Sequence, residues 1–298
     1  MNSYTLLITS LLFIFCTAKS PEKKNDSITT KIENQQKHKN FNNYWYAGKA
    51  EITSYKLTQA RYGQIYDGTA VNIFVTEDFL PQKQVKADYQ NKKNVPILKL
   101  NSTKKYTTGI YPYAIMTSTF SPIDINKKAI KISFSAQEWC GNTFMQLNNR
   151  EDFKIKFFSY FESNADRNLS LKKEVLENDF WNLLRINPAS IKTGNYKVIP
   201  SFEFLGLNHQ EIKAYNATIN LIEKDGFMYF SVSYPTLKRK LTIQLTKEFP
   251  YTIESWEETF TQRGKELTTK ATKIKTIQSA YWSKNGVTDT KERKELGL

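Results

Sequence analysis

From residue 44 to residue 282 the chain repeats one pattern, in which apolar or β-branched residues alternate with polar ones. A period of two places neighbouring side chains on opposite faces of a strand, as a half-buried sheet requires. The alternation is clear in four segments, at 70–77, 130–136, 153–157 and 240–245. Because it continues over most of the chain, it predicts a single all-β domain and excludes a helical bundle.

Short connections predict how the strands follow one another. In the C-terminal half, Asp225-Gly226 separates two alternating segments, and Asp-Gly favours the left-handed backbone of a tight hairpin turn. Connections of this length favour an up-and-down antiparallel meander. The expected strands are 48–57, 70–77, 95–100, 106–120, 130–136, 153–157, 197–204, 214–222, 227–234, 240–245, 251–260 and 266–282.

One segment departs from the alternation. Residues 170–186 place Leu171, Val175, Phe180 and Leu184 near helical spacing, with Ser170 as N-cap and Pro188 after the end. We expect one main helix, at about 170–186, on the concave side of a strongly curved sheet. The predicted fold is therefore an antiparallel curved sheet, an open or half β-barrel, in one domain spanning 44–288.

The first residues resemble an export signal. An apolar run at 6–15 is too short to span a bilayer and ends at Cys16, as in a lipoprotein signal whose cysteine is lipidated. Cleavage after Ala18 and an uncleaved anchor are the alternatives. We expect a signal peptide at 1–18, a flexible polar tether at 19–43 and a charged, fraying tail at 289–298.

The net charge of +14 first suggests a nucleic-acid partner, but lysine and arginine are spread along the chain among acidic residues. No nucleic-acid motif accompanies them, so we expect none as a partner. Two cysteines and two histidines exclude a disulfide framework and make a metal centre improbable. No phosphate loop or catalytic motif is present, so no cofactor and no catalytic residue is assigned.

Five residues are candidates for a functional role. Glu138, Trp139 and Cys140 form the most individual motif, and His209 is the single histidine of the predicted domain. Cys140 with His209 would make a nucleophile and base, whereas a buried structural cysteine is the simpler interpretation. Arg150, which follows several amides, would bind a carboxylate or a sugar, or else belong to a polar hairpin loop.

Two further features leave alternatives open. Glu254 and Glu258 share a strand face with Trp256 and would serve acid–base chemistry on sugars, or else be ordinary surface charge. Phenylalanine and tyrosine are dense in the strands, which core packing explains. A concave sheet lined by rings would also hold an acyl chain or stack on a sugar.

Several short segments, taken together, resemble an exported protein family of Flavobacteria and other Bacteroidetes. They are Tyr44-Trp45-Tyr46 with Gly48-Lys49-Ala50-Glu51, 76–80, 85–88, 109–113, Gln137-Glu138-Trp139-Cys140-Gly141, and Phe249-Pro250 with Ile253 and Trp256-Glu257. Members are commonly labelled "septum formation inhibitor Maf". True Maf proteins are cytoplasmic α/β pyrophosphatases with a basic N-terminal loop, which this chain lacks. The resemblance implies a lipoprotein-like location and supplies no catalytic residues for this chain.

These observations favour a lipid-anchored protein of the cell envelope, periplasmic or associated with the outer membrane, that binds an apolar or glycan ligand or a protein partner. A secreted form is the alternative location. The alternative functions are an envelope hydrolase acting on glycan or peptide, and a structural component of an envelope assembly.

Overall fold

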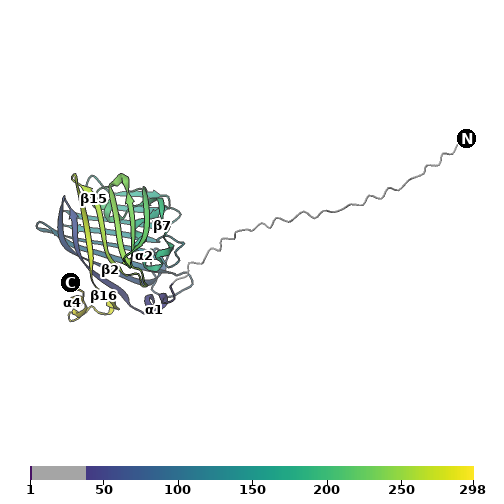
Figure 1. Ribbon diagram of the computed structural model, residues 1–298, viewed down its shortest axis with the longest axis horizontal. Coiled ribbons are helices and arrows are strands. Elements are labelled where there is room, and N and C mark those ends of the chain that lie inside the picture. Colours follow the sequence, from purple (N-terminus) through teal and green to yellow (C-terminus); the bar gives the residue numbers. More distant parts are fainter. Residues whose placement is uncertain (2–37) are drawn as a thin grey trace. The chain divides into compact units, whose positions relative to one another are not determined.

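The computed structural model describes Met1 and residues 38–298. Cys16, the expected signal peptide and most of the expected tether lie outside the described residues. Residues 38–298 belong to one compact unit built on a single 16-stranded sheet. The predicted all-β class is confirmed, as Figure 1 shows.

The strands of the first half of the body are β1 (Ala50–Arg61), β2 (Gln64–Leu80), β3 (Val85–Lys86), β4 (Val95–Thr108), β5 (Tyr111–Pro122), β6 (Lys131–Glu138), β7 (Gly141–Asn149), β8 (Phe153–Ser159) and β9 (Arg167–Leu171). Those of the second half are β10 (Val175–Leu176), β11 (Gly194–Ile199), β12 (Tyr215–Lys224), β13 (Phe227–Tyr234), β14 (Arg239–Thr246), β15 (Ile253–Gln262) and β16 (Lys265–Ser279).

The sheet is one continuous, curved and unclosed meander. Its strand order is β10-β11-β12-β13-β14-β15-β16-β1-β2-β4-β5-β6-β7-β8-β9, with β3 beside β2. Neighbours along this order are antiparallel except for β10 and β11, and β1 joins the two halves by pairing with both β16 and β2. The predicted antiparallel, open half-barrel is therefore confirmed. The Asp225-Gly226 turn is confirmed too, with φ values of 51° and 78°.

Helices are few and short. They are α1 (Phe41–Trp45), α2 (Glu177–Ile186), α3 (Phe202–Leu207) and α4 (Lys291–Glu295), with 3-10 turns η1 (Pro188–Ser190), η2 (Pro235–Leu237) and η3 (Tyr281–Ser283). The main helix begins at Glu177 rather than near 170, because residues 167–171 pair with β8 as strand β9. The expected strand 197–204 is likewise divided, since Ser201 caps α3 by accepting a hydrogen bond from the Phe204 amide.

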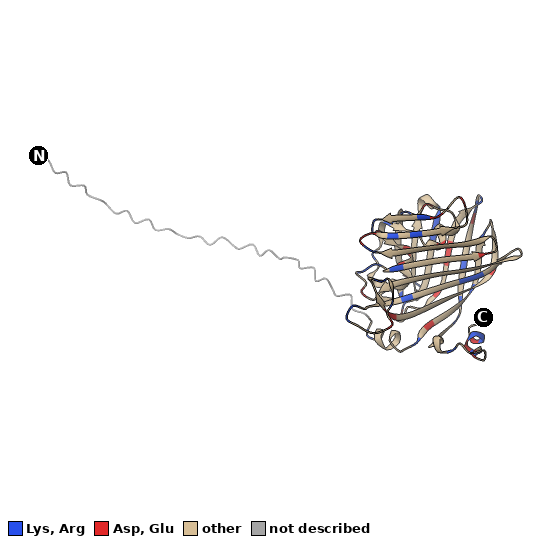
Figure 2. Ribbon diagram, turned by 180° about the vertical axis from the view of Figure 1, so that it is seen from behind, with Lys and Arg blue, Asp and Glu red and all other residues tan. Residues whose placement is uncertain are grey.

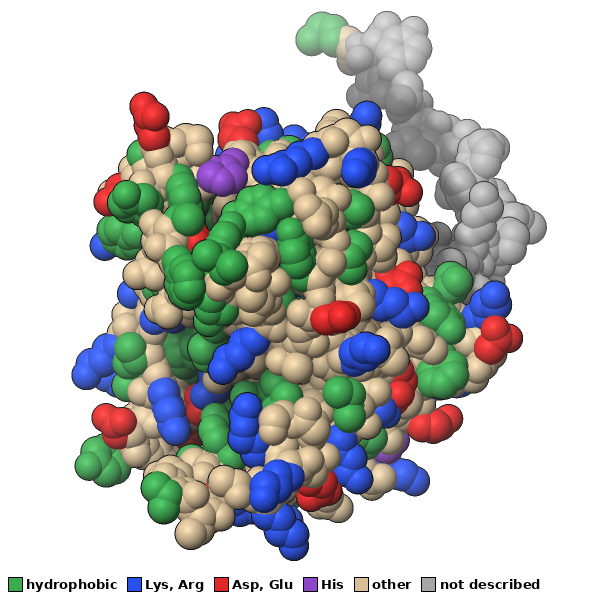
Figure 3. Space-filling model, turned by 90° about the vertical axis from the view of Figure 1, so that its left-hand side faces the viewer, with side chains coloured by type: hydrophobic (Ala, Val, Ile, Leu, Met, Phe, Trp, Pro, Cys, Tyr) green, Lys and Arg blue, Asp and Glu red, His purple; other side chains and the backbone are tan. Residues whose placement is uncertain are grey.

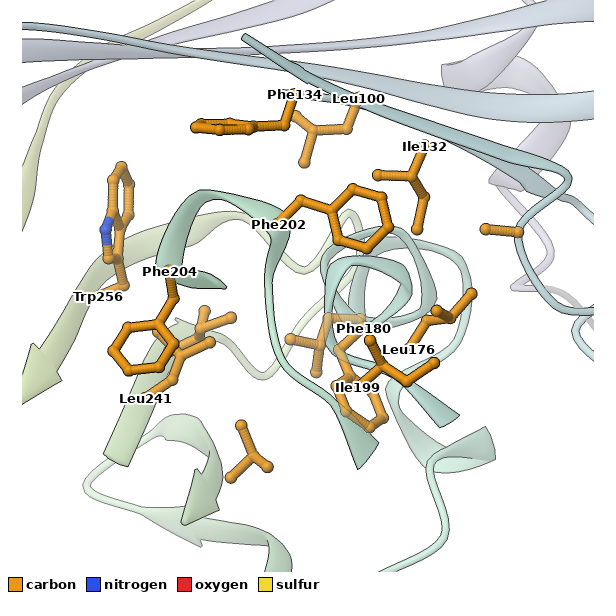
Figure 4. Packing of buried hydrophobic residues seen from close by; sticks show 14 of the residues in the cluster. Leu100, Ile132, Phe134, Leu176, Phe180, Ile199, Phe202, Phe204, Leu241 and Trp256 are labelled. Carbon is orange, nitrogen blue, oxygen red and sulfur yellow. The ribbon is translucent and has the colours of Figure 1, made fainter. Parts of the chain in front are cut away.

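The core lies where α2 and α3 pack inside the curve of the sheet (Figure 4). Phe180 of α2 and Phe202 of α3 belong to the same buried cluster, and both are almost completely buried. Gly206 lets α3 approach the sheet, since a Cβ there would lie 2.7 Å from Cε1 of Phe134 on β6. The two helices thus fill the concave side with apolar side chains, as the sequence analysis anticipated for the main helix.

Three other expectations are wrong. Residues 106–120 are not one strand, because Gly109-Ile110 turns the chain between β4 and β5. The tail does not fray: α4 packs back, Leu296 is buried, and its carbonyl accepts a hydrogen bond from the Ser54 hydroxyl. At the other boundary, folded structure begins before residue 44, since Phe41 of α1 is buried.

The connections of the meander lie at two opposite ends of its strands. We call the end with the turns Tyr62-Gly63, Gly109-Ile110, Trp139-Cys140 and Arg263-Gly264 the turn end. The opposite end, with the segments 81–94, 123–130 and 247–252, is the loop end.

Lysine and arginine are spread over the strands together with acidic residues rather than gathered in one tract (Figure 2).

Candidate functional site at the turn end

The structure brings four of the five candidate residues to the same end of the sheet. Glu138, Trp139 and Cys140 lie at the turn between β6 and β7, and His209 directly follows α3. Tyr160 and Phe161 connect the two groups, because Tyr160 packs on Gly141 and the Phe161 ring lies 5.9 Å from the His209 ring. Arg150 is at the loop end, where its guanidinium donates to the carbonyls of Pro81 and Gln82.

Cys140 is exposed, not buried, and it is not activated. A hydrogen bond to Glu138 is the main cause that raises the pKa of its thiol. A nucleophilic cysteine needs the opposite shift, toward the thiolate. The Glu138 carboxylate also accepts a hydrogen bond from the Cys140 amide at 2.7 Å, and this bond fixes the turn.

His209 forms a hydrogen bond with Ser163 and not with Cys140. Its Nδ1 lies 2.8 Å from the Ser163 hydroxyl, and burial together with the charge of Arg61 lowers its pKa. Among the described residues no carboxylate contacts the second ring nitrogen, so the orienting member of a hydrolase triad is not present there. The pair places two polar groups at the turn end.

Next to His209 is an open pocket of about 310 Å³. Arg61, Tyr62, His209 and Arg263 line it, together with amides that include Gln262. No aspartate or glutamate is among the described residues that line it. An open pocket with two guanidinium groups and no lining carboxylate favours an anionic group.

Both arginines are held by the pocket itself. Their guanidinium carbons lie 4.5 Å and 5.4 Å from the centre of the Tyr62 ring. Arg61 also donates to the Leu207 carbonyl at 2.6 Å, and its buried Nε has no hydrogen-bond partner among the described residues. Guanidinium groups stacked in this way are pre-oriented, so a ligand need not order them.

Three lining residues have left-handed backbone. The φ values are 53° at Tyr62, 51° at His209 and 51° at Arg263. Tyr62 and Arg263 occupy the first position of hairpin turns, where asparagine, aspartate or glycine is usual, and His209 follows the cap of α3, where glycine is usual. The hairpin at Asp225-Gly226 has the usual residue. Three of the eight non-glycine residues with positive φ in the described part of the chain therefore line this pocket, and backbone strain of this kind occurs at functional sites.

A row of aromatic rings leads away from the pocket. We call it the aromatic belt: Tyr62, Tyr113, Tyr111 and Trp139. The hydroxyls of Tyr62 and Tyr113 are 2.6 Å apart, and the ring centres are 5.9 Å apart from Tyr113 to Tyr111 and 6.5 Å from Tyr111 to Trp139. Trp139 is 68% exposed at the far end. Figure 3 shows a face of the body on which hydrophobic side chains gather next to a histidine.

Beneath the pocket, a cluster of charged side chains lies between the curved sheet and the two helices that pack inside it. Arg239 of β14 binds Glu177 of α2 through two bonds of 2.5 and 2.6 Å, and its Nε binds Glu258 of β15 at 2.6 Å. Lys104 and Glu203 form a neighbouring pair at 2.6 Å, and all of these side chains line a cavity of about 50 Å³. Because each charge is paired, we interpret the cluster as support for α2 and α3.

The two glutamates singled out in the sequence are thus separated in role. Glu258 belongs to the interior cluster, while Glu254 pairs with Lys273. Neither carboxylate is free to act as an acid or base, so the arrangement gives no support to acid–base chemistry on sugars.

In the part of the chain that the structure describes, no group of three or more acidic, histidine or cysteine side chains is arranged to hold a metal ion. No helix within it has both the length and the apolar character needed to cross a membrane.

Sequence reasoning missed Arg61, Tyr62 and Arg263. The signal that would find them is a Tyr-Gly and an Arg-Gly pair between alternating segments, since such turns rarely begin with large residues. Their meeting in space follows from the pairing of β1 with both β2 and β16. The chain matches no protein-family model, no curated protein and no solved structure.

Proposed function

We propose that this protein is a non-catalytic binding protein of the cell envelope, and that the turn end holds an acidic oligosaccharide. The observation that supports this most directly is the stacking of Arg61 and Arg263 on Tyr62, in a pocket without a lining carboxylate. Guanidinium groups bind carboxylate or phosphate with two parallel hydrogen bonds. The acidic group of the sugar would lie between them.

The aromatic belt supports a carbohydrate rather than a simple anion. Aromatic faces carry partial negative charge and pack well against the C–H groups of a sugar ring. The belt runs from Tyr62 at the pocket to Trp139, which is exposed and so accessible to a ligand. Tyr113 is buried, so a chain of sugars would extend from the anionic group over the three accessible rings of the belt, those of Tyr62, Tyr111 and Trp139.

The binding test uses calorimetric titration of the full chain with trigalacturonate and with neutral maltotriose. We expect binding of trigalacturonate only. Arg263→Gln should weaken it about tenfold or more, because hydrogen bonds to charged groups contribute about 1.5–3 kcal/mol. Trp139→Ala should weaken it less, since aromatic packing contributes about 0.5–1.5 kcal/mol beyond area.

Matched controls separate the site from general charge and stability. Lys105→Gln removes a positive charge from the exposed side of β4, and Trp282→Ala removes a half-exposed indole in η3, away from the pocket. Both should bind trigalacturonate like the unchanged protein. Equal binding of maltotriose, or equal losses in the controls and the site variants, would reject the proposal.

The envelope location is part of the proposal and depends on Cys16, which lies outside the described residues. Replacement of Cys16 by serine should release the protein from the membrane fraction and abolish acyl labelling in cells. Unchanged membrane association of that variant would reject the lipid anchor and leave the binding proposal to its own test.

A further inference from the structure

A second pocket lies at the loop end, separate from the turn-end pocket. It has a volume of about 230 Å³ and lies between the segment before β6, helix α2 and the turn after η1. This is somewhat below the ~300–1,000 Å³ of pockets that enclose drug-sized ligands. A ligand segment that fits it is therefore small, or only partly enclosed.

The walls of this pocket are mainly apolar. Phe180 and Leu183 come from consecutive turns of α2, Ile219 comes from β12, and Ile125 and Ile191 come from the two flanking segments. Phe180 and Ile219 are buried, whereas Ile125 and Leu183 are half-buried and accessible from the pocket. Apolar walls of this kind stabilise a ligand chiefly by removing its own apolar surface from water.

Three lysines surround the apolar walls. Lys127 and Lys192 are exposed and Lys128 is half-buried, and all three line the pocket. Lys127 lies 3.5 Å from the exposed Asp124, whereas Lys128 and Lys192 make no direct ion pair among the described residues. The charge of Lys128 nevertheless acts on the Asp179 carboxyl, where it opposes the rise in pKa that burial causes. The amino groups of long side chains reach water while their stems cover apolar surface.

Asp179 is the one acidic residue among the described residues that line this pocket. Its two carboxylate oxygens accept hydrogen bonds from the Ser121 hydroxyl at 2.5 Å and from the Ala129 amide at 2.9 Å. Those bonds hold the carboxylate against β5 and the following segment. The three lysines leave the lining positive overall, so an anionic group is favoured over a cationic or neutral one.

We infer that the loop-end pocket binds a single-chain carboxylate amphiphile, with its acyl chain between Leu183, Ile125 and Ile219 and its carboxylate beside Lys128 and Lys192. Apolar walls under a cationic rim match the two chemically different ends of such a molecule. This site does not depend on the oligosaccharide site, because the two pockets share no lining residue.

The test measures binding of decanoate to the full chain by calorimetry, with acetate and 1-decanol as partial ligands. Acetate carries the headgroup without the chain, and decanol the chain without the charge. Decanoate should bind about threefold more tightly than decanol, because each of two exposed ion pairs adds only a modest contribution. Acetate should show no measurable binding.

Two variants examine the two ends of the ligand. Lys128→Gln with Lys192→Gln should reduce the affinity for decanoate to that for decanol and leave decanol unchanged. Ile125→Ser should weaken the binding of decanoate and decanol alike, since it removes apolar wall surface at a half-buried residue on the margin of the core. Lys92→Gln with Lys93→Gln is the matched control, because both lysines are exposed and neither lines the pocket.

The inference is overturned if decanol and decanoate bind equally to the unchanged protein, if the control pair weakens decanoate as much as the rim pair, or if no binding of decanoate occurs. Trigalacturonate should bind unchanged in the rim and Ile125 variants. Loss of both decanoate and trigalacturonate binding in the same variant would indicate unfolding, which circular dichroism detects, and Ile125→Val then provides the milder comparison.

Discussion

Arg185 of α2 and Glu51 of β1 are 134 residues apart in the chain and form a two-pronged ion pair inside the protein, with contacts of 2.5 and 2.6 Å. Both side chains are at most 1% exposed. Arg185 also donates to the Pro250 carbonyl, and Tyr44 donates to Glu51, so the pair joins α2, the first strand and two loop-end segments. It fixes where the main helix ends inside the curved sheet.

Arg185→Met should lower the free energy of unfolding by about 3–5 kcal/mol, because it leaves the Glu51 carboxylate buried without a counter-charge. Urea unfolding followed by tryptophan fluorescence measures this loss. The control is the double variant with Glu51→Leu, which removes both charges and should recover a large part of the stability. If the double variant loses the sum of both single losses, the two residues do not act as a pair.

The sequence was sufficient for the fold class because alternation is a local property of each strand. It also located the Asp225-Gly226 hairpin, where the turn residues have one clear meaning. Phe180 and Leu184 locate helix α2 in the sequence, but its start is misplaced, because Ser170 is a favourable N-cap residue whereas the actual N-cap, Leu176, makes no side-chain capping bond. Only the pairing of 167–171 with β8 excludes a helix there.

The candidate site was less accessible to prediction. Trp139 and His209 were recognised as individual residues, but their common end of the sheet depends on which strands pair. Arg61 and Arg263 are 202 residues apart in sequence and meet at Tyr62 only because β1 pairs with β2 on one side and β16 on the other. Such contacts have no local signature.

Arg263→Asn should stabilise the protein and weaken its ligand binding. Asparagine tolerates the left-handed backbone of the β15–β16 turn, where other residues cost roughly 1–2 kcal/mol. Thermal unfolding should therefore shift upward by about 2–4 °C, while the affinity for trigalacturonate falls. Asp225→Asn is the control, because that turn already has a suitable residue and lies outside the pocket. A lower melting temperature for Arg263→Asn would contradict the strain argument.

Gly206→Ala should destabilise the protein although alanine favours helices. The added methyl would lie 2.7 Å from the Phe134 ring, which is fully buried and cannot withdraw. Overpacking costs about 1–3 kcal/mol and exceeds the helix-propensity gain of up to about 1 kcal/mol. Urea unfolding would show the loss. Combining the change with Phe134→Leu should reduce it, and an unchanged loss would place its cause elsewhere.

Asp179→Asn should change the pH dependence of stability. Burial raises the pKa of Asp179 despite the hydrogen bonds from Ser121 and Ala129, so the folded state favours the neutral acid. The contribution of the neutral Asp179 acid to the free energy of unfolding is complete below the unfolded pKa of about 3.9. It is lost as pH rises through the folded pKa. The variant should therefore gain stability relative to the unchanged protein as pH increases from about 4.

Asp124→Asn is the control of opposite sign for that experiment. A hydrogen bond from the Asn126 backbone lowers the pKa of Asp124, so its contribution exists above the unfolded pKa and is lost as pH falls. Urea titrations across the acidic range measure both differences. Parallel curves for Asp179→Asn and the unchanged protein would show that Asp179 does not titrate differently on folding.

The reactivity of Cys140 distinguishes a turn residue from a nucleophile. Its thiol is exposed, yet the hydrogen bond to Glu138 raises its pKa, so little thiolate forms near neutral pH. Glu138→Gln removes that carboxylate and should increase the rate of reaction with a disulfide reagent, measured by absorbance at fixed pH. Cys140→Ser should bind trigalacturonate normally, because the thiol contacts neither arginine of the pocket. A thiol that reacts faster with Glu138 present than with glutamine would instead mean that the carboxylate acts as its base, and would return the envelope hydrolase to consideration.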